Sequence, residues 1–395
     1  MHLLIHTQYY PPEIGAPQAR LSELAAGLQQ RGMQISVLTA MPNYPTGKIF
    51  PGYRRLFHKE SLDGITIYRT YIVPTQSASF FLRLINYFSF VLSSFWAGLF
   101  LPKVDVILTE SPPLFLCLTG FVLSRLKKAR WIVNVADLWP LSAIELGLLD
   151  KDSLAYRISA RLEAFAYQKA WRVTGQSRTI LADIQCRFPA VQTYHLSNGV
   201  DIELFQPISA IKSSGSVQAI YAGLHGLAQG LDQVLLAAKS LQGRLPITFT
   251  FIGDGPEKEH MVRLTHDLEL DNVTFLSPLP KNEIPPLLAA AEIIIVPLKV
   301  QLTGAVPSKL YEAMAVGNPI VLIAASEAAQ IVKQADCGLC VSPGDVDGIA
   351  RAVTILAENA DERTRLGDNG RTYVVQHFDR QAIIQQFYEF LNAQE

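Results

Sequence analysis

The segment 303–323 constrains the fold more than any other, because it predicts a loop, a short helix and a buried strand in succession. Pro307 and Ser308 are typical of a helix start, since proline has no N–H to leave unpaired and serine can accept a hydrogen bond from one. Gly317 can adopt the left-handed conformation that ends a helix. The run 320–323 is entirely apolar, as is typical of a parallel strand covered on both faces. A chain that contains such a strand needs helices on both sides of a sheet.

Strands and helices are predicted to alternate along the whole chain. The expected strands are the runs 2–7, 35–39, 104–109, 131–135, 172–178, 193–196, 217–222, 248–252, 272–276, 293–296 and 320–323. A length of 395 residues suffices for two cores, and a segment rich in Pro, Ser, Gly and Lys over 205–216 predicts the boundary between them. We therefore expect two α/β domains, over 1–205 and 206–375, and a final amphipathic helix within 376–395 that returns to the first domain.

The composition excludes some classes of protein and predicts an apolar surface. A net charge of −1 gives no electrostatic basis for binding nucleic acid. Charged residues make up 17% of the chain, below the roughly 25% of typical soluble domains, and the mean hydropathy is +0.20. The amino terminus has no basic segment of a signal peptide, and four cysteines fit a reducing compartment, so we expect a cytoplasmic protein. The single CxxC at 337–340 and the eight histidines lack the spacing of metal ligands, so no metal is expected.

The segment 84–101 has no charged residue, and at eighteen positions it is at the lower limit for a membrane span. A span would interrupt the alternation of strands and helices, so we expect a surface or core helix instead. Its small or polar residues fall on one helical face, at Asn86, Ser89, Ser93 and Ala97. The bulky face is expected either to dip into a membrane interface or to lie in the core, and the sequence leaves both open. The following segment 113–130, with its basic end, could extend the surface toward anionic lipid.

The helix that starts at Ser308 is the strongest candidate for a ligand site. It follows the predicted strand 293–296, so its start lies at the carboxyl edge of a sheet, where α/β proteins bind ligands. Free N–H groups of Ser308 and Lys309 would suit a phosphate. Lys309 and Glu312 share one helical face, so the lysine can meet a phosphate charge while the glutamate accepts two hydrogen bonds from a ribose diol. The alternative is an ordinary Lys–Glu pair on the surface.

Other candidates also follow predicted strands. Gly15 could let a sugar or phosphate approach the backbone, or it could simply allow a turn. The glycine-containing loop 223–230 could wrap a phosphate with its N–H groups. Asp137 follows the strand 131–135 and could orient or deprotonate an acceptor hydroxyl. It could instead only cap the turn before Pro140.

Several stretches together resemble the retaining nucleotide-sugar glycosyltransferases of family 4, which have the GT-B fold of two Rossmann-like domains with parallel sheets facing a cleft. The matching segments, in family order, are YYPPEIG at 9–15, DLWP at 137–140, NGVD at 198–201, GDGP at 253–256, NVTF at 272–275, PSKLYE at 307–312 and PGD at 343–345. The resemblance implies that the donor base lies near 277–280. Pattern and resemblance together predict Asp137 and Glu312 as catalytic residues, and as donor-binding residues Gly15, Gly223, His225, Gln229, Pro280, Ser308, Lys309, Leu310 and Glu312.

The chain departs from the family pattern where the family binds its donor. Gly304 replaces a glutamate that touches the donor sugar, and Ala136 replaces a histidine before Asp137. Leu224 and Gln229 replace an arginine and a lysine that contact the diphosphate. Lys309, which stands in place of an apolar residue, could partly supply the missing charge.

The resemblance is to a branch that builds bacterial surface polysaccharides and includes transferases of N-acetylfucosamine-type sugars. It implies transfer of an N-acetylated sugar from a UDP-sugar to a lipid-linked saccharide, at the cytoplasmic face of the inner membrane, without a further cofactor or a metal. Asp345 and Asp347 match the Asp-x-Asp of metal-dependent transferases, but they open a predicted helix and are expected to cap it. Two alternatives remain: a nucleotide-sugar epimerase of the same fold, and a non-catalytic partner subunit, which the departures above suggest.

Overall fold

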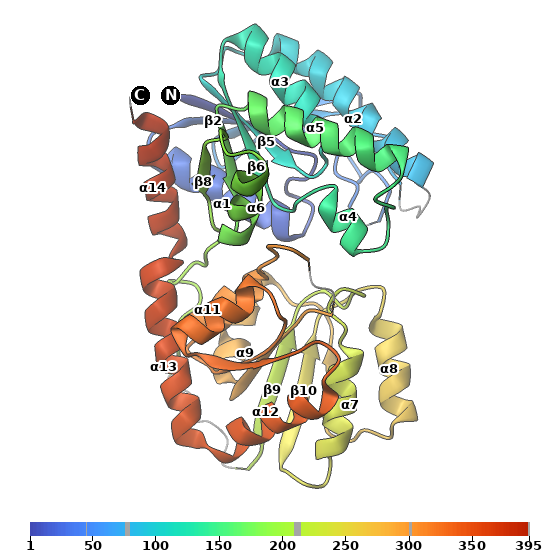
Figure 1. Ribbon diagram of the computed structural model, residues 1–395, viewed down its shortest axis with the longest axis vertical. Helices are drawn as coiled ribbons and strands as arrows, with labels where there is room; N and C mark the ends of the chain where they lie inside the picture. Colours follow the sequence, from blue (N-terminus) through green and yellow to red (C-terminus); the bar gives the residue numbers. More distant parts are fainter. Residues whose placement is uncertain (45, 76–79, 209–214, 300–301, 394–395) are drawn as a thin grey trace. The chain divides into compact units, whose positions relative to one another are not determined.

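The computed structural model describes residues 1–44, 46–75, 80–208, 215–299 and 302–393. The chain forms two compact units, Met1–Ser197 with Gln381–Glu395, and Asn198–Arg380 (Figure 1). The segment 198–205, which we expected in the first domain, belongs to the second, because Val200 and Phe205 are buried in its core. The Val200 amide also donates to the carbonyl of Phe378, at 2.9 Å.

The first unit is a sheet of eight strands with helices on both faces. The strand order is β3-β4-β2-β1-β5-β6-β7-β8, and β3 is antiparallel to β4 while the other pairs are parallel. The strands are β1 (His2–His6), β2 (Gln34–Ala40), β3 (Phe57–Leu62), β4 (Ile65–Thr70), β5 (Val106–Ser111), β6 (Arg130–Val135), β7 (Arg172–Gly175) and β8 (Thr193–His195). The helices are α1 (Ala16–Gln30), α2 (Phe80–Phe100), α3 (Leu116–Lys127), α4 (Leu141–Glu145), α5 (Leu154–Lys169), α6 (Arg178–Arg187) and α14 (Arg380–Asn392).

Successive residues of a strand point to opposite faces of the sheet, so they pack in different hydrophobic cores. Leu3 and Ile5 of β1 pack with α1 and the final helix α14, whereas Leu4 packs with the core under α3, α5 and α6. The last helix thus contributes Ile384, Phe387 and Leu391 to the core of the first unit.

Helix α2 exposes some of its bulky residues and buries others, such as Val91 at 8% exposure, so the expectation of a core helix holds for only part of its surface. Leu92, Trp96 and Phe100 are 60%, 62% and 84% exposed, while Phe90 and Ser94 are buried. The helix also begins earlier than predicted, at Phe80. Within the described part of the chain, none of the helices has the combination of length and apolar character needed to cross a bilayer.

The second unit is a parallel sheet of six strands, in the order β11-β10-β9-β12-β13-β14. Its strands are β9 (Val217–Ala222), β10 (Ile247–Ile252), β11 (Val273–Leu276), β12 (Ile293–Pro297), β13 (Ile320–Ile323) and β14 (Gly338–Val341). Its helices are α7 (Asp232–Leu241), α8 (Lys258–Asp267), α9 (Ile284–Ala290), α10 (Ser308–Ala315), α11 (Glu327–Ala335), α12 (Val346–Glu358) and α13 (Ala360–His377). One face packs on α9, α10, α11 and α13, the other on α7 and α12. The predicted fold class, two α/β domains with mainly parallel sheets, is therefore confirmed (Figure 1).

One smaller expectation is also confirmed. Asp345 caps α12, because its Oδ1 accepts from the amide of Gly348 at 2.8 Å. Cys337 is buried at the entrance of β14.

Candidate functional site

The carboxyl edge of the second sheet contains the point at which the strand order reverses. The central strand β9 lies between β10 and β12. After β9 the chain builds β10 and β11 on one side, and then returns to build β12, β13 and β14 on the other. The loops that leave β9 and β12 therefore run in opposite directions, and open α/β sheets bind ligands in the crevice between such loops. The first loop begins with Gly223, and the second leads into α10.

Helix α10 begins at Ser308, directly after the extended backbone of Pro307. The carbonyl of Pro307 accepts from the amide of Leu310 at 3.0 Å, so the helix itself does not use the amides of Ser308 and Lys309. No side chain caps the helix, and the expected serine cap is wrong because Ser308 is the first helical residue rather than the one before it. The helix ends as predicted, since Gly317 has a φ of 73°.

The side chain of Lys309 passes over Gly223 and connects the two loops. A Cβ atom placed on Gly223 would overlap Cε of Lys309 and come within 2.9 Å of its Nζ. The hydroxyl of Tyr221 lies 2.8 Å from the same position and donates to the carbonyl of Leu224 at 2.7 Å. Burial raises the pKa of Tyr221, and the nearby carboxylate of Glu312 raises it further. Three predicted donor-binding residues, Gly223, Lys309 and Glu312, thus lie near one another at the switch point of the sheet.

Replacing Gly223 by alanine should weaken the binding of a nucleoside diphosphate about tenfold, as expected when one charge-assisted hydrogen bond is lost. The new Cβ must push aside the Lys309 side chain, which is flexible and can move without unfolding the sheet, and it also crowds the Tyr221 hydroxyl. Titration calorimetry measures the affinity, and Gly215→Ala is the matched control because its Cβ would meet nothing within 4 Å. Unchanged affinity of the Gly223→Ala protein would mean that the position of Lys309 is irrelevant to binding.

His225 is fully buried, and neither of its ring nitrogens has a partner in ordinary hydrogen-bond geometry among the described residues, although the backbone of Ile252 lies close enough to act on its pKa. Its ring lies beside Tyr221 and Phe275, with centroids 6.0 and 6.1 Å away. Its amide donates to the carbonyl of Asp254 at 2.8 Å. Gly255 makes this contact possible, because a Cβ there would lie 2.8 Å from the His225 nitrogen. Buried polar atoms are normally paired, so the ring is a candidate ligand contact.

The stability of the second unit should fall as the pH decreases from about 6.5 to about 4. Burial, aided by the charge of Lys258, lowers the pKa of His225 to about 4. Over that interval the unfolded chain binds a proton at this histidine and the folded chain does not, so protonation favours unfolding. Hydrogen exchange of β9 and β10 measures the effect. His225→Phe should flatten the slope, whereas the exposed His260→Phe should keep it, and equal slopes in both variants would refute the assignment.

Two lysines that sequence reasoning did not select lie around the same loops. Lys299 packs over Gly230, where a Cβ would lie 2.7 Å from its Cδ, and its amine pairs with Asp232 at 3.1 Å. Lys258 donates its amine to the carbonyl of Gly253 at 2.7 Å. The sequence pattern does not identify Lys299, because its contacts with Gly230 and Asp232 join segments that are distant in the chain.

The remaining predicted donor residues occupy different environments. Gln229 is half-buried, and its Oε1 has no hydrogen-bond partner among the described residues. Pro280 is exposed in the loop after β11, two strands from the switch point. Leu310 is fully buried in the core and its amide is bound to Pro307, so we leave it out of the candidate site. Gly304 has a φ of 78°, which a residue with a side chain would rarely adopt.

Asp137 lies at the carboxyl edge of the first sheet, between β6 and α4. Burial raises its pKa, the charge of Arg20 opposes this, and Glu145 adds to it. The residue before α4 is Pro140, and no side chain caps that helix.

A network of buried polar side chains that sequence reasoning missed lies beside this carboxylate. Arg20 of α1 forms an ion pair with Glu110 at the end of β5 and donates to Oε1 of Gln176 at 3.0 Å. Glu110 also accepts from the side-chain amide of Asn134 in β6, at 2.6 Å. Gln176 in turn donates to the carbonyl of Ala136. The network holds the residue that precedes the predicted catalytic aspartate.

Replacing Glu110 by alanine should lower the free energy of unfolding of the first unit by about 3 kcal/mol, because Arg20 and Asn134 lose their buried acceptor. Tryptophan fluorescence during urea unfolding reports this unit selectively, since the four tryptophans lie at 96, 131, 139 and 171. Binding of a nucleoside diphosphate by the second unit should be unchanged. A loss below about 1 kcal/mol would show that the network contributes little.

Gly15 directly precedes α1, with an extended φ of 171° that any residue can adopt. A Cβ there would crowd the side chain of Gln18. In the same loop, the carboxylate of Glu13 accepts from the amides of Asn43 and Tyr44, each at 2.8 Å. The loop is therefore fixed in place by its own glutamate.

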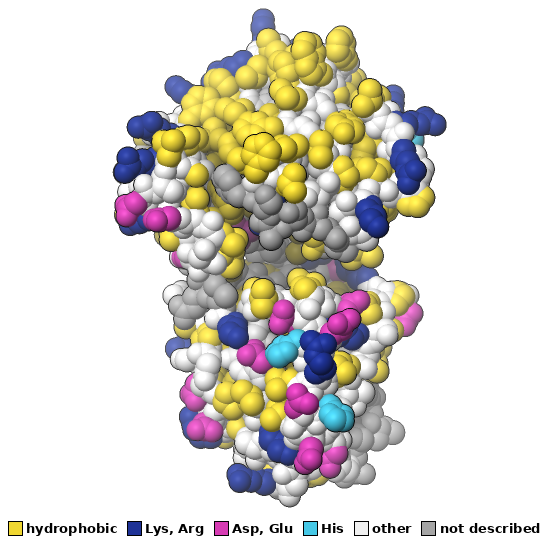
Figure 2. Space-filling view, turned by 90° about the vertical axis from the view of Figure 1, so that its right-hand side faces the viewer, with side chains coloured by type: hydrophobic (Ala, Val, Ile, Leu, Met, Phe, Trp, Pro, Cys, Tyr) yellow, Lys and Arg dark blue, Asp and Glu magenta, His cyan; other side chains and the backbone are white. Residues whose placement is uncertain are grey.

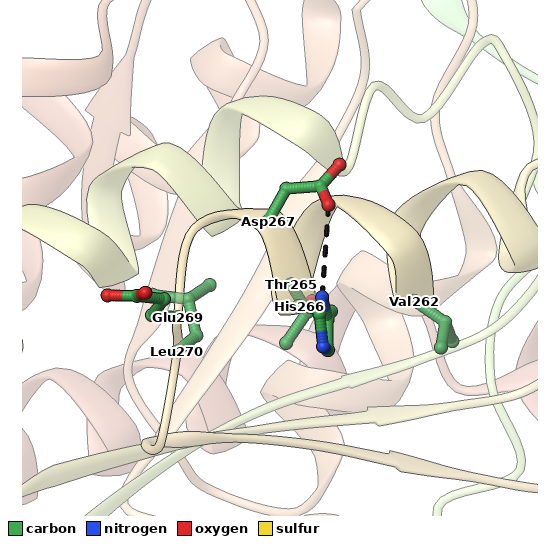
Figure 3. Close-up of a pocket in the computed structure, with 6 residues that line it drawn as sticks. All are labelled: Val262, Thr265, His266, Asp267, Glu269 and Leu270. Carbon is green, nitrogen blue, oxygen red and sulfur yellow. Dashed lines mark ion pairs between the residues drawn. The ribbon is translucent and has the colours of Figure 1, made fainter.

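A surface hollow at the end of α8 does not belong to the candidate site. It is lined by Val262, Thr265, His266, Asp267, Glu269 and Leu270, with an exposed contact of 3.9 Å between His266 and Asp267 (Figure 3). Because α8 leaves the carboxyl end of β10 and leads to the amino end of β11, its last residues lie at the opposite edge of the sheet.

Two protein-family models match the chain, one over each half. The model described as "Glycosyl transferase 4-like domain" matches residues 15–199. The model described as "Glycosyl transferases group 1" matches residues 207–373. Together they span nearly the whole chain.

A protein of Escherichia coli (strain K12) and two solved structures are similar to the chain over almost its full length. The protein WcaI, named as a glycosyl transferase of colanic acid biosynthesis, is 25% identical over 98% of this chain and 98% of its own length. Sucrose-phosphate synthase from Thermosynechococcus elongatus has a TM-score of 0.79 and 17% identity, covering 99% of this chain and 98% of its own. Anabaena HepE, solved in complex with UDP, has a TM-score of 0.74 and 18% identity, covering 99% of both chains. At these identities, the two structures establish a shared fold.

Proposed function

Because the chain belongs to the glycosyltransferases with the GT-B fold, we propose that it moves a sugar from a UDP-sugar donor to a lipid-linked saccharide acceptor, with retention of anomeric configuration. The proposed sugar is an N-acetylated amino or deoxy sugar, and the proposed pathway builds a bacterial surface polysaccharide. The naming of WcaI for colanic acid supports the pathway, and the UDP bound by HepE supports the nucleotide. The resemblance to family 4 and its N-acetylfucosaminyl branch supports retention and the class of sugar.

The observation that carries the proposal is the start of α10 at the switch point of the second sheet. Two backbone amides that the helix does not use, at Ser308 and Lys309, are available to a diphosphate. The Lys309 amine lies over Gly223 of the neighbouring loop, where it can meet the same charge. Glu312 follows one turn later and can accept two hydrogen bonds from the ribose hydroxyls. This order of contacts matches the order of diphosphate and ribose in a nucleoside diphosphate.

The same groups can stabilise the leaving diphosphate during transfer. Negative charge develops on the diphosphate as the bond to the sugar breaks, and fixed N–H groups and a cation beside it lower the barrier. Lys309 and Lys299 lie around loops in which the family's arginine and lysine are replaced by Leu224 and Gln229. We therefore propose transfer without a metal ion.

On the acceptor side, we assign Asp137 to positioning or deprotonating the acceptor hydroxyl. Burial raises its pKa, which favours proton uptake at a carboxylate that otherwise would be a weak base. A lipid-linked acceptor implies that the enzyme works at the cytoplasmic face of the inner membrane.

Incubation with a panel of nucleotide sugars, with and without a lipid-linked acceptor, tests the proposal. We expect product only when a UDP-sugar and the acceptor are both present, in buffer containing EDTA, and Asp137→Asn should abolish transfer while keeping UDP affinity. Conversion of the donor alone would identify an epimerase instead. Failure to bind any nucleotide would instead favour a non-catalytic subunit, as the replacements at Leu224 and Gln229 suggest.

A further inference from the structure

Three helices of the first unit expose apolar side chains at every fourth position, which places them along one side of each helix. In α2 the exposed residues are Leu92, Trp96 and Phe100. The same spacing recurs in α3 and α5, at Leu118, Val122, Leu126, Leu154 and Ile158. Monomeric soluble proteins rarely expose so many large apolar side chains together without a binding role.

The three helices pack on one another, so we treat their exposed side chains as one surface, the α2–α3–α5 surface. Gly98 lets α2 approach α3 closely, because a Cβ there would lie 2.9 Å from Cδ2 of Leu123. The rings of Phe121 in α3 and Phe165 in α5 are 4.9 Å apart between centroids. Figure 2 shows hydrophobic side chains gathered over this unit, with Lys and Arg at several margins and acidic side chains at one.

Every exposed charged side chain on the described residues of these helices is basic. The exposed cations are Arg83, Arg125, Arg157, Arg161 and Lys169. The single acidic residue of the three helices, Glu163, is buried and paired with Arg187 at 2.6 Å. The charges that the three helices themselves expose are thus of one sign, whereas the exposed Asp150 and Asp152 lie in the turn before α5.

We propose that the α2–α3–α5 surface docks the protein on a lipid bilayer that contains anionic lipid, with α2 lying in the plane of the interface. Apolar side chains enter the acyl boundary while Arg and Lys meet the headgroups, the arrangement of interfacial helices. A protein partner would need an acidic rim matched to these cations, whereas an anionic leaflet supplies negative charge everywhere. The choice of lipid also rests on the proposed function, because a lipid-linked acceptor lies in that leaflet.

Sedimentation of the full chain with vesicles of phosphatidylcholine alone, or mixed with phosphatidylglycerol, tests the docking surface. We expect binding to the mixed vesicles only, weakened by high salt because exposed charges are screened. Trp96→Glu with Phe100→Glu should lower the partition coefficient at least about tenfold, and Arg157→Gln with Arg161→Gln should lower it and reduce its salt dependence. The matched control is Ile355→Glu, an exposed apolar residue of α12 in the second unit, which should bind vesicles like the wild type.

Three results would overturn the proposal: no binding of the wild type to mixed vesicles, unchanged binding of the Trp96→Glu, Phe100→Glu protein, or a wild-type dimer that this double variant dissociates. The last would assign the surface to a second copy of the chain. UDP affinity and melting temperature are measured on the same samples, and both should be unchanged in the variants. Vesicle binding without UDP binding would refute the proposed function but not the docking surface. UDP binding without vesicle binding would refute the docking surface alone.

Discussion

Replacement of Lys309 by methionine should weaken the binding of UDP by about ten- to a hundredfold and leave the binding of uridine unchanged. A charge-assisted hydrogen bond contributes roughly 1.5–3 kcal/mol, and each 1.4 kcal/mol is about tenfold in affinity. In the proposed binding mode, only the diphosphate reaches the Lys309 amine, which lies beside Gly223. Titration calorimetry with both ligands measures the difference, and methionine keeps the length of the side chain while removing its charge.

Lys333→Met is the matched control for this experiment. Lys333 is an exposed lysine in the last turn of α11, and that helix ends at the amino edge of the sheet, before β14. The control should bind both ligands like the wild type. Equal weakening of UDP and uridine by Lys309→Met would mean that the lysine supports the fold of the site rather than the diphosphate.

Replacement of Glu312 by alanine should weaken UDP and uridine by the same factor, between about ten- and a hundredfold, as expected for hydrogen bonds to a charged acceptor. The carboxylate is assigned to the ribose, which both ligands share, one helical turn from the amides of Ser308 and Lys309. The wild type should also discriminate against 2′-deoxyuridine diphosphate, and the alanine variant should lose this discrimination. The affinities for the ribose and deoxyribose ligands measure it directly.

Glu312→Gln separates a loss of hydrogen bonding from a loss of structure. The amide keeps one acceptor oxygen and the shape of the side chain, so its affinity for UDP should lie between those of the wild type and the alanine variant. An alanine variant that kept full UDP affinity would show that the ribose lies elsewhere. Together, Lys309→Met and Glu312→Ala therefore test the diphosphate contact and the ribose contact separately.

The sequence predicted those parts of the fold whose signals are local. The apolar run 320–323 becomes β13, buried on both faces, and Gly317 ends α10 with the expected positive φ. Proline at 307 and serine at 308 located the helix start to within one residue, although the serine does not cap it. These features depend on neighbouring residues, so composition and spacing suffice to predict them.

Features that depend on distant pairs could not be predicted. The edge strand β3 has an exposed, charged sequence without an apolar run, and only Asp63 and Gly64, both with positive φ, signal its hairpin with β4. Glu110 has no local signal of its role, because its partner Arg20 lies 90 residues earlier. The contact between Lys309 and Gly223 likewise requires the strand order of the sheet. For α2, the absence of charge could not distinguish burial from an exposed apolar face.

A crystal structure of the protein with UDP tests the central claim most directly. We predict diphosphate oxygens within hydrogen-bond distance of the Ser308 and Lys309 amides and of the Lys309 amine, with the ribose hydroxyls at the Glu312 carboxylate. UDP bound elsewhere on the chain, or bound with its diphosphate directed away from the start of α10, would contradict the account.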